Sequence, residues 1–457
     1  MEKLFHYTWK HRLFPLRSLV TTDGRTVEVL DVGLHNHDAG PDFFNAKIKI
    51  DGTMWVGNVE LHLKSSHWNL HGHDRDEAYD NTILHVVCEA DMDVFNSKGQ
   101  RLVQMVVPIP DNLRDNYDRL LRDDRYPRCH DILGQLPSLT IHSWLSALQT
   151  ERLERKTEDI MARVNALCGG WEEATFQTLA RYYGFGVNND VFEQWAKALP
   201  MRAIDHHRDD LFQIEAIFFG QAGLLDIDTA PLSHREEMDG DLYFHRLHRE
   251  YKYLAHKFTL TPIDGKQWKF LRMRPQNFPY IRLSQLATLH YNRTAGLSLL
   301  LECNTIEDVE KALATQVSEY WQTHYVFGVE SEKNDKKMSR ASIENLVINV
   351  VAPLMFAYGR YRHKEQLVNK AIDLLEQIKA EDNNIVRLWR ECGVEVKTAG
   401  DSQALIQLKK EYCDKHECLR CRMGYHYIKS NPGFLKEEPS PPTPKGGVSE
   451  SDSDGEG

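Results

Sequence analysis

The sequence lacks the features that would assign it to a membrane-spanning or secreted class of protein. It contains no run of 18 apolar residues, so a transmembrane helix is not expected. Its first residues, MEKLFHYTWKHRLF, include neither an apolar core nor a small-residue cleavage site, so a signal peptide is not expected either. Only eight of the 457 residues are cysteines, too few for a disulfide framework. These absences predict a cytoplasmic protein with no membrane association.

The sequence also lacks an excess of positive charge. Its 56 Lys and Arg residues against 67 Asp and Glu residues give a formal net charge of −11. Such a protein is not covered by a positive field, but a local basic groove is sufficient to bind nucleic acid. The content of 41% hydrophobic and 27% charged residues is that of an ordinary globular protein. Nucleic acid therefore stays a candidate partner, and the composition leaves the oligomeric state open.

Hydrophobic periodicity divides the chain into an α/β part and a helical part. A short amphipathic helix precedes strand-length segments rich in Val and Ile, such as TVEVLDVG, WVGNVELHLKSS and NTILHVVCEA. Helical periodicity dominates from about residue 138, and the final segment, KEEPSPPTPKGGVSESDSDGEG, has almost nothing to bury. We predict an α+β protein with an α/β domain over residues 1–115, a large all-helical domain over 116–430 and a disordered acidic tail over 431–457.

Polar side chains gather on one face of a predicted hairpin within residues 35–68. Strand alternation places Glu60, His62 and Lys64 on one face and leucines on the other. Asp42 begins the preceding strand, and the turn DGT between the two strands can bring its carboxylate beside that of Glu60. Two close carboxylates repel unless a cation lies between them, and hard oxygen ligands suit Mg²⁺. The pattern predicts a Mg²⁺ site held by Asp42 and Glu60, with Lys64 placed to orient a water or to neutralise charge on a phosphate.

The order Pro41-Asp42, strand, then an acid and a lysine on the next strand resembles the signature of the PD-(D/E)XK nucleases. The usual spacing places the lysine at position 62, which is a histidine here, and Lys64 lies one strand repeat further on. The resemblance implies a PD-(D/E)XK-like N-terminal domain that hydrolyses phosphodiester bonds, with Glu2 as an extra acid. The catalytic residues that it implies are Asp42, Glu60, His62 and Lys64. The alternative is a polar outer sheet face with a turn aspartate.

The segment HGHDRD, residues 71–76, is rich in potential metal ligands. It resembles part of the HxHxDH motif of metallo-β-lactamase-like hydrolases, although Asp76 stands where that motif ends in histidine and its second half is missing. Loop histidines and aspartates also cap turns and helices. We favour a position for His71 or His73 at the rim of the hairpin cleft over a dinuclear zinc site.

Three cysteines with the spacing C-x₄-C-x₂-C lie near the end of the helical part, namely Cys413, Cys418 and Cys421. Thiolates so close in sequence suit zinc or part of an iron–sulfur cluster, and either needs a further ligand. The candidates for that ligand are Cys129, His416 and His426. A site completed by Cys129 resembles the iron–sulfur staple of some PD-(D/E)XK nucleases, which implies a 4Fe–4S cluster. The alternative is three reduced cysteines that act as small apolar residues.

The segment WKFLRMRPQNFPYIR interleaves Arg272, Arg274 and Arg282 with aromatic residues. Arginines beside aromatic rings suit phosphate contacts and base stacking, which predicts nucleic-acid binding by these three residues. The same composition suits a buried junction between two helical layers. Both interpretations stay open.

Long segments of the chain resemble an uncharacterised bacterial family, a domain of unknown function found mainly in Bacteroidetes. The matching segments are AGPDFFNAKI, GNVELHLKSSHW, HGHDRDEAYDN, RMRPQNFPYIRLSQLA, YWQTHYVFG and SQALIQLKKEYCDKHECLRC. That family implies no established activity. The sequence therefore predicts a metal-dependent nuclease or a nucleic-acid-binding protein, and its rival is a non-catalytic interaction protein with a metal-stapled helical domain.

Overall fold

A computed structural model of the chain describes residues 1–16, 18–36, 38–199, 201–230, 234–294 and 296–430. Contacts between residues divide the chain into two compact units. The first comprises Met1–Ser138, Glu391–Val394 and the described residues from Lys410 onward, and the second comprises Leu139–Arg390 and Glu395–Lys409. The predicted tail over 431–457 lies outside the described residues.

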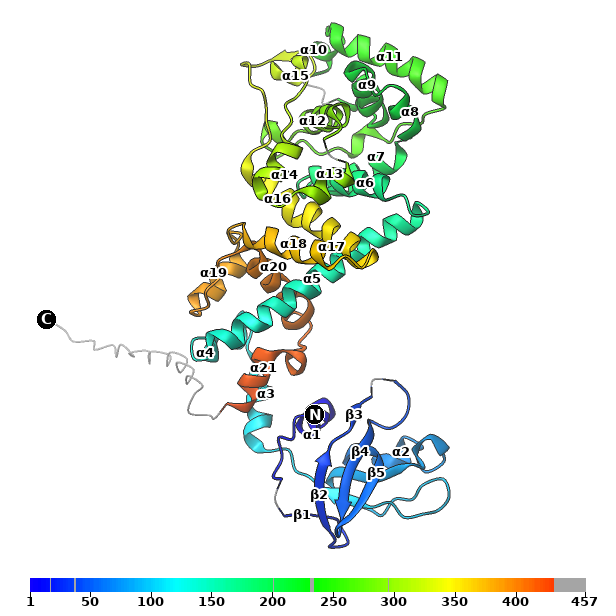
Figure 1. The fold of residues 1–457 in the computed structure, drawn as a ribbon, viewed down its shortest axis with the longest axis vertical. Helices are drawn as coiled ribbons and strands as arrows, with labels where there is room; N and C mark the ends of the chain where they lie inside the picture. Colours follow the sequence, from blue (N-terminus) through cyan, green and yellow to red (C-terminus); the bar gives the residue numbers. More distant parts are fainter. Residues whose placement is uncertain (17, 37, 200, 231–233, 295, 431–457) are drawn as a thin grey trace, which may run out of the picture. The chain divides into compact units, whose positions relative to one another are not determined.

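A mixed β-sheet forms the centre of the first unit (Figure 1). Its strands are β1 (Leu19–Val20), β2 (Thr26–Asp31), β3 (Leu34–His35), β4 (Phe43–Ile50), β5 (Thr53–Lys64), β6 (Thr82–Glu89) and β7 (Gln104–Val106). The strand order is β1-β2-β4-β5-β6-β7, with β3 paired to β4. Strands β2, β4 and β5 pair in antiparallel fashion, whereas β5–β6 and β6–β7 are parallel. A parallel pair needs a crossover connection, and residues 65–81 supply it with the short helix α2 (His67–Leu70).

Helix α1 (Glu2–Lys10) covers the apolar face of this sheet. Its Phe5 and Trp9 side chains are fully buried, in a cluster that includes Phe43, Val59 and Leu61 from the β4–β5 hairpin. The indole Nε1 of Trp9 donates a hydrogen bond of 3.2 Å to a main-chain carbonyl oxygen in the segment after β2. The apolar positions that alternate along the strands therefore build the core, and the intervening polar positions face the opposite side.

Three helices complete the first unit: α3 (Asp111–Arg122), α4 (His130–Leu133) and α21 (Arg422–Lys429). Helix α21 packs against α3, about 300 residues earlier in the chain. The buried side-chain amide of Asn116 on α3 donates to the carbonyl oxygens of Ile428 and Ser430 at 3.0 and 2.8 Å, so it satisfies main-chain groups at the end of α21. The predicted boundary near residue 115 differs from this division, because α3, α4 and the cysteine segment pack within the first unit.

The second unit is helical apart from a small hairpin. Its helices are α5 (Ser138–Ala166, beginning at the boundary), α6 (Trp171–Tyr183), α7 (Asn189–Ala198), α8 (Met201–His206), α9 (Leu211–Gln221), α10 (Arg235–Asp239), α11 (Leu242–Phe258), α12 (Pro279–Asn292), α13 (Leu297–Glu302), α14 (Ile306–Leu313), α15 (Glu319–Gln322), α16 (Arg340–Leu346), α17 (Ala352–Tyr361), α18 (Glu365–Glu376), α19 (Asn384–Glu391) and α20 (Ala399–Leu408). The hairpin pairs β8 (His324–Val326) with β9 (Val329–Glu330). The prediction of a sheet domain followed by a large helical part is confirmed.

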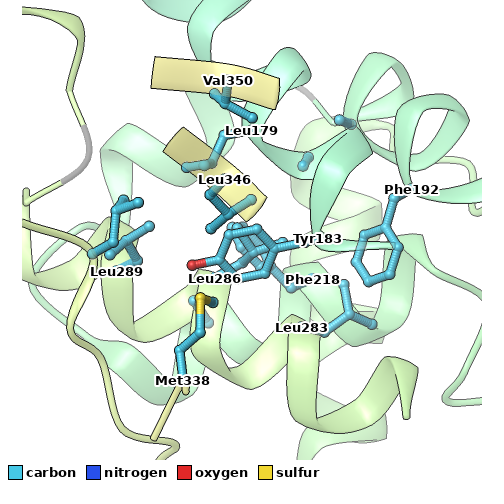
Figure 2. Close-up of a cluster of buried hydrophobic side chains, with 14 of the residues drawn as sticks. Leu179, Tyr183, Phe192, Phe218, Leu283, Leu286, Leu289, Met338, Leu346 and Val350 are labelled. Carbon is cyan, nitrogen blue, oxygen red and sulfur yellow. The ribbon is translucent and has the colours of Figure 1, made fainter. Parts of the chain in front are cut away.

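Helices α9 and α12 form the interior of the second unit. All residues from Pro279 to Leu289 of α12 are buried, which is the behaviour of a helix surrounded on every side. Figure 2 shows the aromatic ring of Tyr183 among Leu286, Leu346 and other apolar side chains from several helices. Close packing of this kind makes the core sensitive to changes of a single methylene group.

One stretch within the described residues, Arg340–Tyr361, is long and apolar enough to cross a membrane by length and composition alone. It joins α16 to α17 through a π-helical turn at Val347–Val351. However, 67% of its most apolar window is buried inside the unit, and a core helix meets the same criteria.

Candidate metal centre on strand β5

The carboxyl groups of Asp42 and Glu60 each accept a hydrogen bond from the main chain of the other residue's strand segment. Asp42 directly precedes β4, and Phe43 pairs with Val59 on β5, so the acids lie opposite each other. The main-chain N–H of Asp42 donates to Glu60 Oε2 at 2.9 Å, and the N–H of Leu61 donates to Asp42 Oδ2 at 3.0 Å. The predicted approach of these two acids is therefore present in the structure.

Two imidazole rings lie beside the Glu60 carboxylate, and a third contacts one of them. The Nε2 atom of His73 lies 3.3 Å from Glu60 Oε1, and the Nε2 atom of His62 lies 3.7 Å from the same oxygen. The Nδ1 atom of His71 lies 3.1 Å from His62 Nε2. Among the described residues, His62, His71 and His73 each offer one ligand atom within 4.8 Å of the other two. The loop histidines thus join the hairpin acids at one place.

The chain after β5 is folded so that the loop histidines return to the strand. Trp68 on α2 is fully buried, and its Nε1 donates to the carbonyl oxygen of Phe95 at 2.9 Å. The main-chain N–H of His73 donates to the carbonyl oxygen of Trp68 at 3.0 Å, which closes the turn that carries the HGH segment. Gly72 has a φ of +80° between the two histidines, a conformation that glycine adopts readily.

His85 on β6 lies directly behind His62. Its Nε2 atom is 2.9 Å from His62 Nδ1, and both residues are buried. Burial and the neighbouring imidazoles, His85 first among them, lower the pKa of His62 to about 2. Burial also lowers the pKa of His85 to about 3. Both rings are therefore neutral at physiological pH, which is the form that binds metal ions.

Helix α1 brings a further imidazole to the acid pair. The Nε2 atom of His6 lies 3.4 Å from Asp42 Oδ2. Burial and the Glu60 carboxylate raise the pKa of Asp42 to about 8, because a second negative charge is unfavourable in this half-buried position. Asp42 is thus poised to gain or lose a proton near neutral pH.

Three imidazoles form the candidate ligand group, and the Glu60 carboxylate lies beside two of them. With bonds of 2.0–2.1 Å, two ligands of a tetrahedral ion lie roughly 3.3 Å apart. The separations of 3.1 Å between His62 Nε2 and His71 Nδ1, 3.3 Å between His73 Nε2 and Glu60 Oε1 and 3.7 Å between His62 Nε2 and Glu60 Oε1 are near that value. The contact between His62 Nδ1 and His85 is also the kind of outer contact that fixes a ligand imidazole.

A pocket with basic walls adjoins the acid pair. It has a volume of about 570 Å³, and His6, which contacts Asp42, forms part of its wall. Its other walls include the cationic or titratable side chains of Lys3, Lys10, His11 and Arg420, together with the acid Glu417. Glu2, the predicted extra acid, lies on α1, as His6 does, and its negative charge helps to raise the pKa of Asp42.

Lys64 occupies a different position from the other predicted catalytic residues. It lies at the exposed end of β5, and its ammonium group is 2.9 Å from the Glu89 carboxylate on β6. Among the interactions described for it, none joins Lys64 to Asp42 or Glu60. In this structure His62, rather than Lys64, stands beside the acid pair.

The four cysteines of the predicted staple lie in the first unit. Burial raises the pKa of the Cys129 thiol, and the thiols of Cys421, Cys413 and Cys418 raise it further, so the upstream cysteine is close to the C-terminal three. The guanidinium Nη1 of Arg128 donates to the carbonyl oxygen of Cys413 at 3.0 Å. Among the described residues, the four sulfur atoms do not all lie within 4.8 Å of one another.

The three arginines of the segment 268–282 have different surroundings in the second unit. Arg272 and Arg274 are exposed, whereas Arg282 is buried on α12. Arg274 and Arg282 line the same small pocket, and Arg272 is not among the lining residues. The predicted basic segment is therefore partly a surface feature and partly a core feature.

No curated protein and no solved structure matches the chain. A family model described as protein of unknown function (DUF2851) matches residues 2–384, and the chain belongs to that family.

Proposed function

We propose that the protein is a metal-dependent hydrolase of phosphodiester bonds. The observation that carries the proposal is the grouping of His62, His71 and His73, whose ligand atoms lie within 4.8 Å of one another, beside the Glu60 carboxylate, which lies 3.3 Å from His73 and 3.7 Å from His62. A single carboxylate with imidazoles is a donor set that binds Zn²⁺, Mn²⁺ or Fe²⁺, whereas Mg²⁺ prefers oxygen ligands alone. The histidines therefore favour a transition metal over the Mg²⁺ predicted from the acid pair.

An ion held there would supply a water of lowered pKa as the nucleophile. The residues around it have separate tasks. His85 holds His62 through Nδ1, which leaves Nε2 for the ion. Asp42, which is held beside Glu60 by main-chain hydrogen bonds, is placed to exchange a proton with a water or a leaving oxygen.

The basic pocket supports a phosphate-containing substrate. Lys3, Lys10 and Arg420 line the same pocket as His6, which contacts Asp42. A local cationic wall raises the concentration of anionic substrates even when the whole chain is negative. This electrostatic arrangement favours phosphodiesters over neutral esters.

The strand order also supports a PD-(D/E)XK-like domain. An antiparallel run of β2, β4 and β5 is followed by a crossover to the parallel strand β6, with Pro41-Asp42 before β4 and Glu60 on β5. His62 stands at the position where that signature has its lysine. We propose that the first unit contains a domain of this architecture and that His62 replaces the lysine of the signature.

We propose separately that the cysteine segment binds a structural metal. A cation can replace the protons of neighbouring thiols, and the effect of Cys421, Cys413 and Cys418 on the pKa of Cys129 supports Cys129 as the upstream ligand. Four thiolates would suit either Zn²⁺ or a 4Fe–4S cluster.

A cleavage assay with metal analysis tests the proposed hydrolase. The purified protein is analysed for bound metals and incubated with supercoiled plasmid, single-stranded DNA and RNA in the presence of Mn²⁺, Zn²⁺ or Mg²⁺. We expect bound transition metal and cleavage of at least one substrate, with a loss of about 100-fold or more in Glu60→Gln and His62→Ala. Glu28→Gln is the matched control, because Glu28 is an exposed acid of the same sheet that pairs with Lys49.

Two results would contradict the proposal. A wild-type protein that holds no metal and cleaves none of the substrates would favour the non-catalytic interaction protein. Cleavage that survives in both Glu60→Gln and His62→Ala would place the activity elsewhere or in a contaminant.

A further inference from the structure

A second polar pocket lies in the helical unit, and its charged walls all have the same sign. Its volume is about 120 Å³, and its cationic lining residues are Arg274, Arg282, Lys336 and Lys337. The other lining side chains are the amides of Gln276, Asn277 and Gln285 and the hydroxyls of Ser339 and Ser342, and none of the described residues that line the pocket is a carboxylate. Lys337 lies 3.4 Å from the Asp335 carboxylate, which is not among the lining residues, whereas no ion pair is described for Arg274, Arg282 or Lys336.

Arg282 supplies a buried guanidinium without a carboxylate partner at hydrogen-bond distance. Its side chain is 4% exposed, and it donates from Nη1 to Gln285 Oε1 at 2.8 Å and from Nη2 to Asn277 Oδ1 at 2.6 Å. Its Nε–H is buried without a hydrogen-bond partner, and its guanidinium stacks 4.3 Å from the ring centre of Phe185. Burial lowers the pKa of Arg282 to about 10.

Lys336 adds a second buried cation to the same wall. The residue is 2% exposed, and its ammonium group donates to the carbonyl oxygen of Gln322 at 3.0 Å and lies 4.1 Å from the ring centre of Tyr325. These partners are neutral. Isolated buried charges are unfavourable unless an opposite charge accompanies them, so two such cations beside one pocket indicate a missing anion.

We propose that this pocket binds a phosphate group, either inorganic phosphate or the phosphomonoester end of a small molecule. A tetrahedral oxyanion matches the forked donors of arginine, and Arg274 at the rim can close over it. The volume admits a phosphate group but not a whole nucleotide, so the remainder of a larger ligand would lie outside. The site goes beyond the proposed hydrolase, because its lining residues all belong to the helical unit.

Binding of defined anions to the full chain tests this site. Isothermal titration and thermal unfolding are measured with inorganic phosphate, with glycerol 3-phosphate and with chloride at constant ionic strength. We expect saturable binding of at least one phosphate compound and an increase in Tm that chloride does not produce. Tighter binding of glycerol 3-phosphate identifies a phosphomonoester ligand, and tighter binding of inorganic phosphate identifies the free anion.

Three variants connect the binding to the pocket. Arg274→Gln should weaken phosphate binding by about 10-fold, which corresponds to the loss of one charge-assisted contact. Because Arg274 is exposed, this variant is expected to fold normally, whereas Arg282→Gln combines weaker binding with altered core packing. Arg272→Gln is the control, since Arg272 is an exposed arginine two residues away that does not line the pocket.

Several outcomes would overturn the inference. They are equal effects of phosphate and chloride on Tm, the same loss of binding in Arg272→Gln as in Arg274→Gln, and binding of a 12-nucleotide DNA without binding of either phosphate compound. The last result would instead make the pocket part of a nucleic-acid surface.

Discussion

The Nδ1 atom of His62 lies 2.9 Å from the Nε2 atom of His85. Strands β5 and β6 are parallel, and their register places Glu60 opposite His85. His85 on β6 therefore lies beside both Glu60 and His62 on β5. Because Nδ1 of His62 is engaged, its Nε2 atom is directed to the site where Glu60 and His71 also converge.

Removal of His85 should weaken metal binding without removing a ligand. We expect His85→Gln to lower the affinity for the ion by about 10–100-fold, because the orientation of His62 is no longer fixed. Competition with a chromogenic chelator measures the affinity, and circular dichroism checks the fold. His67→Gln is the control, since the His67 ring lies near His62, at 6.1 Å, but is not among the grouped ligands. Equal affinity in wild type and His85→Gln would show that His85 does not position the ligand.

Lys64 and His62 should differ in their importance for cleavage. The ammonium group of Lys64 is paired with Glu89 at the exposed end of β5. We expect Lys64→Ala to keep cleavage within about 3-fold of wild type, whereas His62→Ala loses it. The initial rate of plasmid nicking measures both. If Lys64→Ala is the more damaging change, the site uses the lysine of the PD-(D/E)XK signature and not the imidazole.

Loss of a cysteine ligand should destabilise the first unit. Metal binding at a thiolate site contributes directly to folding, so Cys413→Ser, Cys418→Ser and Cys421→Ser should lower Tm by similar amounts and reduce the metal content. Cys168→Ser, at an exposed cysteine, is the control.

The fourth ligand distinguishes the two metals. Loss of colour and metal in Cys129→Ser indicates an iron–sulfur cluster, and loss of zinc from a colourless protein in His426→Ala indicates a local zinc site. Protein purified without oxygen that contains neither metal would contradict both.

The buried carboxyl group of Glu215 should make stability depend on pH. Burial raises its pKa, although Ser284 and Ser318 donate hydrogen bonds to it at 2.7 and 3.1 Å. The folded state thus keeps a proton that the unfolded chain releases near pH 4.3. The free energy of unfolding therefore falls as the pH rises from that value towards the raised pKa of the folded protein.

Glu215→Gln cannot ionise, and its stability should change less with pH. Urea unfolding at a series of pH values between 4 and 8 measures the slope for wild type and variant. Glu236→Gln, at an exposed acid of the same unit, should keep the wild-type slope. An unchanged slope in Glu215→Gln would show that another group dominates the pH dependence.

Gly57 allows β5 to approach β6 closely, on the strand that carries Glu60 and His62. A Cβ atom at this position would lie 2.4 Å from Ile83 Cγ2 and 3.0 Å from the carbonyl oxygen of Asn81. We expect Gly57→Ala to lower the free energy of unfolding by about 1–3 kcal/mol through overpacking. Urea unfolding checks this, and in the double variant with Ile83→Ala the two effects should not add. Simple additivity would mean that the two side chains do not meet.

The sequence predicted the parts of the site that depend on local pattern. Period-two alternation placed Glu60 and His62 on one strand face, and the turn between the strands brought Asp42 to Glu60. The sequence also favoured a position for His71 or His73 at the rim of the hairpin cleft. It could not show that both would group with His62, because their position depends on the buried Trp68 and the crossover to β6. The alternation along the strands thus predicted which residues of the hairpin lie together, but not the position of the loop that carries His71 and His73.

Two other histidines were missed for different reasons. His85 lies within NTILHVVCEA, and the sequence of this buried strand does not indicate that His85 contacts His62 on the neighbouring strand. His6 lies on an amphipathic helix whose contact with the sheet is a tertiary event. Similarly, the pairing of α21 with α3 gives no periodic signal, so the sequence placed the cysteine segment with the helical domain.

The packing of Asn116 against the end of α21 has a consequence for the order in which the chain folds during synthesis. Domains usually fold from the N-terminus as the ribosome releases them. Here the first unit needs residues near 428, which are translated after the whole of the second unit. The sheet can form early, but helix α3 must wait for its partner while nearly 300 further residues emerge. The part of the protein that is made first is therefore completed last.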